Sequence, residues 1–161
     1  MQSAEILDVK NFMQLLFQSE AFDSYETVEA VIISDMTYSI EGKLNRDFYS
    51  QDELETMFPA DISFLPWQYT KPKVFSIIKG KRTPSYMKIV FKLTEHNFSE
   101  NKSSHNSNDI TGIYFNFIFK DQKLNVTCSV SYKTFTLDKT FEQEIFSNFI
   151  TLLKLNSITT N

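Results

Sequence analysis

The sequence predicts an α+β domain in which an antiparallel sheet of five or more strands carries helices packed on one face. Three observations support this class: helical periodicity near both ends of the chain, segments of alternating apolar and polar residues between them, and short connections. Short connections favour antiparallel pairing, because parallel strands need long crossovers. A length of 161 residues suits a single domain, residues 1–161. Sixteen phenylalanines against three glycines predict a well-filled core.

The first half of the chain predicts a helix followed by a hairpin. The helix covers residues 8–17, where the apolar residues recur on one face: Val9, Phe12, Met13, Leu16 and Phe17. Asp8 stands at its N-cap, and Leu7 and Phe12 have the spacing of a hydrophobic staple. Residues 26–44 are β-branched and partly alternating, which predicts two strands joined at Ser34-Asp35.

Prolines divide the middle of the chain. Residues 52–57 predict a short helix turn, and residues 60–65, between two prolines, a short strand. A second helix is predicted from Pro72 to Lys79, because proline suits the first turn of a helix. Gly80 then stands at C′, where a positive φ ends many helices.

In the second half of the chain, apolar and polar residues alternate more clearly. Met87, Ile89, Phe91 and Leu93 point to one side of a strand over residues 86–93. Residues 95–110 are rich in Asn and Ser and predict a surface loop. Residues 113–119 and 124–130 form the clearest hairpin, with Asp121-Gln122 as its turn. A helix over residues 139–154, capped by Asp138 or Thr140, precedes a polar tail that we expect to be frayed.

The chain can also be divided into two similar halves, residues 8–44 and 72–132. If residues 1–6 and 60–65 are short strands, each half begins β-α-β-β. This layout resembles one domain of a DNA processivity clamp, which is built from two such units. The resemblance lies in layout without a diagnostic motif, and it departs from the clamp by a C-terminal helix and a long polar loop.

Composition excludes several kinds of site. Cys128 is the only cysteine, so neither an intramolecular disulfide nor a multi-cysteine metal site can form, and its alternating neighbours place it in the core. His96 and His105 fall in or beside the polar loop, which favours surface histidines over a metal site or a catalytic base. Glycine-rich phosphate loops are absent. We therefore predict no cofactor, no metal and no catalytic residue, without excluding an enzyme whose site is unrecognised.

The remaining signal is a basic cluster in an acidic chain of net charge −4. The candidate residues for binding an anion or nucleic acid are Lys71, Lys73, Lys79, Lys81, Arg82, Thr83 and Lys88. An arginine can hold a phosphate or carboxylate through two hydrogen bonds, with lysines as point charges around it. The alternative interpretation is a helix end whose cations complement the helix dipole and whose turn is solvated.

Four segments resemble an uncharacterised family of clostridial-type bacterial proteins: KGKRTPSYMKIVF, DVKNFMQLLF, EGKLNRDF and KTFTLDK. The resemblance spans nearly the whole chain. It implies a cytoplasmic bacterial protein and transfers no activity. The N-terminus has no basic and apolar leader, and no apolar run approaches the roughly 18–20 residues that cross a bilayer, so we expect a cytoplasmic location and no membrane contact.

Three functional classes stay open. The first is a non-catalytic interaction domain that binds a protein partner, which we favour because the chain is acidic and lacks catalytic motifs. The second is a nucleic-acid-proximal, clamp-like module that contacts phosphates through residues 71–82. The third is an enzyme, which would need a concave pocket with convergent polar groups. Association into a homo-oligomer is compatible with each of them.

Overall fold

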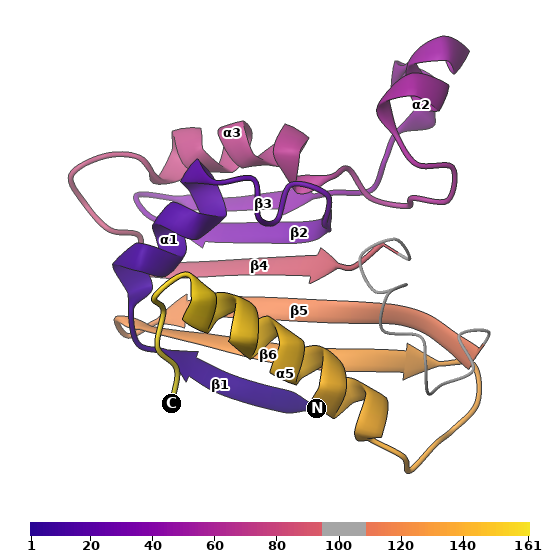
Figure 1. Cartoon of the computed structure of the whole chain (residues 1–161). Coiled ribbons are helices and arrows are strands. Elements are labelled where there is room, and N and C mark those ends of the chain that lie inside the picture. Colours follow the sequence, from indigo (N-terminus) through magenta and orange to yellow (C-terminus); the bar gives the residue numbers. More distant parts are fainter. Residues whose placement is uncertain (95–108) are drawn as a thin grey trace.

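A computed structural model of the chain describes residues 1–94 and 109–161 (Figure 1). The strands are β1 (Gln2–Ile6), β2 (Glu26–Ile33), β3 (Thr37–Glu41), β4 (Tyr86–Lys92), β5 (Ile110–Lys120) and β6 (Lys123–Tyr132). The helices are α1 (Val9–Gln18), α2 (Gln51–Met57), α3 (Trp67–Ile78) and α5 (Thr140–Leu155), with a short 3-10 helix, η1 (Arg46–Phe48), before α2. Residues 95–108, which contain both histidines and most of the predicted polar loop, lie outside this description.

The described strands form one antiparallel sheet of six strands in the order β1-β6-β5-β4-β2-β3. Two hairpins, β2–β3 and β5–β6, supply neighbouring strands, while β4 lies between them and β1 pairs with β6. The β5–β6 turn falls at Asp121 and Gln122, as predicted, and both residues have positive φ angles of 52° and 63°. The sheet confirms the α+β class.

One face of the sheet is apolar, and the helices cover it. In β4 the residues alternate between buried and half-buried, and the buried Ile89 pairs with Ala30 of β2 and Phe117 of β5. Because paired residues of neighbouring strands share a face, one apolar surface crosses the sheet. Helices α1, α3 and α5 pack on that surface (Figure 1), which confirms the prediction of helices on one face.

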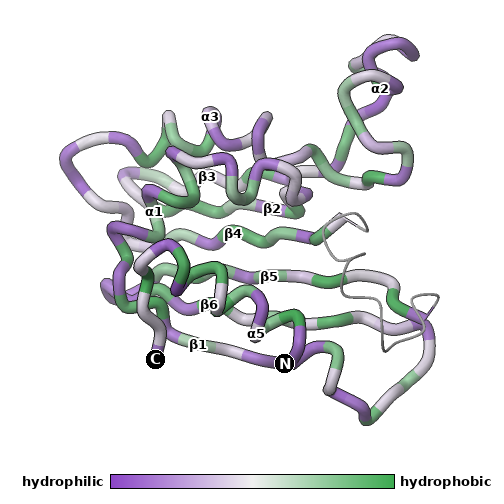
Figure 2. The backbone as a smooth tube through the Cα atoms, in the orientation of Figure 1, coloured by the Kyte–Doolittle hydropathy of each residue, from purple (hydrophilic) through white to green (hydrophobic). Residues whose placement is uncertain are grey.

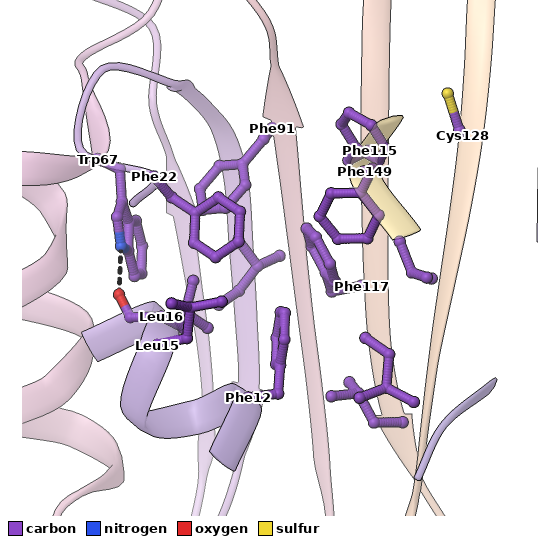
Figure 3. Close-up of a cluster of buried hydrophobic side chains, with 14 of the residues drawn as sticks. Phe12, Leu15, Leu16, Phe22, Trp67, Phe91, Phe115, Phe117, Cys128 and Phe149 are labelled. Carbon is purple, nitrogen blue, oxygen red and sulfur yellow. Dashed lines mark hydrogen bonds between the residues drawn. The ribbon is translucent and has the colours of Figure 1, made fainter. Parts of the chain in front are cut away.

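Aromatic rings fill the space between helices and sheet (Figure 3). Phe117 lies at the centre, with its ring 5.1 Å from that of Phe12 and 5.8 Å from that of Phe149. Trp67 is fully buried, and its indole N–H donates a 2.9 Å hydrogen bond to the carbonyl of Leu16. Burying one such ring contributes roughly 1.5–3 kcal/mol to the stability of the folded state. The phenylalanine-rich composition therefore supplies the side chains that fill and stabilise this core.

Helix α3 begins five residues before the predicted start. The backbone N–H groups of Trp67 and Gln68 donate to the carbonyls of Tyr25 and Asp23, at 2.8 and 3.1 Å. These long-range bonds satisfy donors that a helix N-terminus leaves free, so the helix starts before Pro72 and includes it. The prediction of Pro72 in the first turn is therefore wrong. Gly80 does follow the C-cap and has a φ of 144°, as predicted.

The C-terminal tail is ordered, which corrects the prediction of a frayed end. Ile158 is 1% exposed, and Thr160 pairs with Ile6 at the edge of β1. Thr159 donates its backbone N–H and its hydroxyl to the carboxylate of Asp8, at 2.7 and 2.6 Å. The side chain of Asp8 therefore binds the tail instead of capping α1, and these hydrogen bonds lower its pKa.

Two other local predictions at helix starts are wrong. Leu7 is 52% exposed, so it does not form a hydrophobic staple with the buried Phe12. The N-cap of α5 is Lys139 rather than Asp138 or Thr140, and no capping box forms. Asp138 still assists this helix start, because its carboxylate accepts a 2.9 Å hydrogen bond from the N–H of Thr140.

Residues 44–62, which we call the α2 lobe, project from the body of the molecule (Figure 1). The lobe has a small apolar cluster of its own around Leu44, Phe58 and Ile62. The predicted strand at residues 60–65 is absent, since this stretch forms a single bridge between Lys43 and Phe64. Consequently, the first half has the order β1-α1-β2-β3, whereas the second begins at α3 without a leading strand.

Candidate functional site

The structure divides the predicted basic cluster into separate groups. Lys71 is half-buried, and its ammonium lies 2.6 Å from Asp23 Oδ1 and 3.0 Å from the carbonyl of Ser19. It joins α3 to the connection between α1 and β2. Lys88 lies on the sheet face opposite the helices, where its ammonium is 2.6 Å from Glu29 Oε1. That hydrogen bond raises the pKa of Lys88. Both lysines therefore have intramolecular partners.

The other members of the cluster are exposed. Lys73 lies on α3, and its ammonium donates a 3.3 Å hydrogen bond to the carbonyl of Tyr69. Lys79, Lys81, Arg82 and Thr83 lie in the connection between α3 and β4, a hydrophilic stretch in Figure 2. A ligand can therefore reach Lys73 and this connection, which holds the other four exposed members of the cluster.

A groove opens beside this connection, and we call it the basic groove. It has a volume of about 440 Å³ and is lined by Val9, Lys10, Met13, Ile78, Gly80, Arg82, Thr83, Pro84, Met87 and Phe119. Two of the predicted residues, Arg82 and Thr83, are among them. The groove thus brings α1, the end of α3 and the start of β4 together around one hollow.

The floor of the groove is apolar because of the register of the sheet and the periodicity of α1. Met87 and Phe119 are direct partners across β4 and β5, and both are buried. Val9 and Met13 are four residues apart and so share a face of α1. The floor offers thioether and aromatic surface, and methionine adapts readily to ligands of different shape.

The α3–β4 connection is held at both ends. The N–H of Lys79 donates to the carbonyl of Phe75 at 2.9 Å, and Gly80 then turns the chain with a φ of 144°. At the other end, the N–H of Ser85 donates to the carbonyl of Ile33 at 2.9 Å. These attachments place Arg82 and Thr83 along the groove before β4 begins.

Two cations also line the groove. Lys10 and Arg82 are exposed, and neither forms an ion pair with any residue that the structure describes. A guanidinium with free N–H groups can bind a carboxylate or phosphate through two hydrogen bonds. The groove can therefore hold an apolar group that carries or adjoins an anion. Sequence reasoning missed Lys10 and Met13, because only the docking of α1 on the sheet brings them to Arg82.

Comparison with known proteins places the chain in a family. The model of a family of unknown function, DUF5721, matches residues 14–160. The chain belongs to DUF5721. No curated protein and no solved structure matched it in the comparisons. Among the described parts of this DUF5721 chain, no helix has the length and apolar character needed to cross a bilayer.

Among the described residues of the DUF5721 chain, the titratable groups with strongly shifted pKa values lie outside the basic groove. Cys128 is fully buried, as its alternation with apolar neighbours predicted, and burial raises its pKa to about 12. Burial also raises the pKa of Tyr25 to about 12. Within residues 1–94 and 109–161, no three His, Cys, Asp or Glu side chains are arranged to hold a metal ion.

Proposed function

We propose that this DUF5721 chain is a non-catalytic cytoplasmic interaction domain that binds a short segment of a protein partner in the basic groove. The observation that carries the proposal is that two exposed cations, Lys10 and Arg82, line the same groove as an apolar floor. A buried thiol as the only cysteine is compatible with a reducing compartment.

The chemistry of the groove specifies the segment. A volume of about 440 Å³ lies in the usual range of ligand sites and suits one or two large side chains. Burying an apolar side chain on the floor supplies affinity, while the cations select an acidic neighbour and reject a basic one. The expected segment therefore carries an aromatic or large aliphatic residue beside Asp or Glu.

A displayed library of random peptides tests this proposal directly. Selection on the wild-type chain should enrich peptides that place an acidic residue next to a large apolar one. A synthetic peptide of that consensus should lose about tenfold in affinity with Arg82→Glu, because the lost attraction and the new repulsion together amount to about 1.4 kcal/mol. Met13→Lys should weaken binding as well, since it places a charge on the apolar floor.

Lys73→Glu is the matched control, because it makes the same charge change on the exposed side of α3, away from the groove. Affinity for the peptide should stay within about twofold of the wild type in this variant. The proposal is wrong if no consensus emerges, or if the selected peptides bind the Arg82→Glu and Lys73→Glu variants equally well.

A second candidate is a nucleic-acid-proximal, clamp-like module that contacts phosphates. It is favoured by the three exposed cations of the α3–β4 connection, Lys79, Lys81 and Arg82, which form no ion pair with described residues. Such a module should be retained on DNA at low salt and released steeply as salt rises. Reversing the charges of Lys81 and Arg82 together should abolish retention, and a wild-type chain that is not retained would exclude this candidate.

A further inference from the structure

The charges of the chain are distributed unevenly. The α2 lobe, residues 44–62, contains one basic residue, Arg46, and five acidic ones: Asp47, Asp52, Glu53, Glu55 and Asp61. The lobe alone thus has a net charge of −4, equal to that of the entire chain, and the remaining residues balance each other. An acidic projection and a basic groove are therefore separate features of one molecule.

The lobe also presents an aromatic ring to solvent. Phe48, at the end of η1, is 78% exposed, and its neighbour Asp47 is exposed as well. The N-cap of this 3-10 helix is Asn45, whose side-chain oxygen accepts a hydrogen bond from the N–H of Asp47 at 3.3 Å. A large apolar side chain beside a carboxylate is the pattern that the basic groove is expected to select.

The two features lie at opposite ends of the molecule. The lobe is joined to the body next to Glu26, which pairs with Lys92 at the end of β4. The groove includes Met87, at the beginning of the same strand. Figure 1 likewise shows α2 far from the α3–β4 connection. The lobe therefore cannot enter the groove of its own chain, and it can enter the groove of another.

We infer that a second copy of this chain supplies the segment bound in the basic groove. In this contact Phe48 of one copy lies on the floor formed by Met13, Met87 and Phe119 of the next, and Asp47 faces Arg82. The inference rests on the proposed function, because both place the bound segment in the same groove.

The geometry of the contact determines the kind of assembly. The groove and the lobe are different surfaces, so each copy that accepts a lobe still offers its own. Such a head-to-tail contact adds copies in succession, giving open chains or closed rings, the smallest ring being a pair in which each lobe enters the other copy's groove. Since the pairing is between exposed opposite charges, it weakens as salt screens them.

Analytical ultracentrifugation of the full chain at low salt, from about 1 μM to about 1 mM, tests this inference across the range of weak contacts. The mean mass should rise with concentration in the wild type and fall on addition of salt. Phe48→Ser should remain monomeric over this range. Phe135→Ser is its matched control, because Phe135 is 90% exposed but lies between β6 and α5, and this variant should associate like the wild type.

Mixing a variant with a disabled groove and a variant with a disabled lobe tests directly whether the lobe of one copy binds the groove of another. Arg82→Glu leaves an intact lobe and Phe48→Ser an intact groove, so each alone should be monomeric while the mixture should form pairs that grow no further. In a single chain, Asp47→Lys combined with Arg82→Glu exchanges the two charges and should restore association.

Some outcomes separate this inference from the function on which it rests. A wild-type chain that stays monomeric at low salt, or a Phe48→Ser variant that associates normally, overturns self-recognition, while peptides selected in the groove would still support the interaction domain. A symmetric dimer that persists in both blocked variants also overturns it. Failure of both the peptide selection and the association would reject the groove as a binding site.

Discussion

Gln122 adopts a backbone conformation that an L-residue rarely takes, with a φ of 63° following 52° at Asp121. Two positive φ angles in a two-residue turn are the pattern of a type I′ hairpin, which favours glycine at the second position. A side chain in this region costs roughly 1–2 kcal/mol. Gln122→Gly should therefore raise the free energy of unfolding by about 1 kcal/mol, part of the gain being offset by greater freedom of the unfolded chain.

Urea denaturation followed by circular dichroism measures this effect. The matched control is Gln14→Gly, the same substitution at an exposed position inside α1. There glycine loses helix propensity, and the free energy of unfolding should fall by about 1 kcal/mol. Equal effects of the two substitutions would show that the φ angle of Gln122 does not limit stability.

Single residues also show where sequence reasoning about the site reached its limit. Arg82 and Thr83 do line the groove. Lys71 and Lys88 carry the same charge in the sequence, but they meet Asp23 and Glu29, which lie 48 and 59 positions away in the chain. Local composition identifies a cation, whereas the tertiary structure determines whether an acidic partner neutralises it.

At the scale of elements, α3 contains a proline that removes one of its backbone hydrogen bonds. Pro72 is exposed, and it lies inside the helix because tertiary hydrogen bonds start the helix at Trp67. A proline at this position has no N–H to donate to the carbonyl of Gln68, and its ring crowds that carbonyl. Pro72→Ala should stabilise the chain by about 1–3 kcal/mol in thermal or urea unfolding.

Pro59→Ala is the control for this prediction, because Pro59 is exposed and lies beyond the end of α2. Removing that proline restores no helical hydrogen bond and frees the unfolded chain, so no gain in stability is expected. A Pro72→Ala variant no more stable than the wild type would indicate that α3 is kinked around the proline at little cost.

The elements that could be predicted from the sequence are those specified by nearby residues. The helix at residues 8–17 and the turn at Asp121-Gln122 follow from periodicity and spacing within a few positions. The start of α3 depends on Tyr25, and the ordered tail depends on Asp8, 151 residues before Thr159. These contacts exist only after the chain has folded, so no local sequence pattern predicts them. The resemblance to an uncharacterised family was confirmed, and it brought no site with it.

At the scale of the whole molecule, the rate at which a reagent labels the Cys128 thiol measures how often the whole chain unfolds. Cys128 lies in β6 and has no exposed surface, and burial raises its pKa to about 12. In the folded state the thiol is therefore protonated, and a reagent cannot reach it. Labelling by a thiol reagent should require the sheet to open. When reclosing is fast, the labelling rate is the intrinsic rate multiplied by the opening equilibrium constant. The opening free energy obtained in this way should equal the free energy of unfolding from urea.

The Pro72→Ala variant distinguishes global from local opening. Helix α3 packs on β2, at the far side of the sheet from β1 and β6. If Cys128 is exposed only by global unfolding, a gain of about 1.4 kcal/mol in α3 should slow labelling about tenfold. If instead β1 detaches from β6 while the rest stays folded, labelling should be faster than global unfolding and indifferent to Pro72→Ala. The bridge between Ile6 and Thr160 and the bonds from Thr159 to Asp8 oppose that detachment, so the global route is expected.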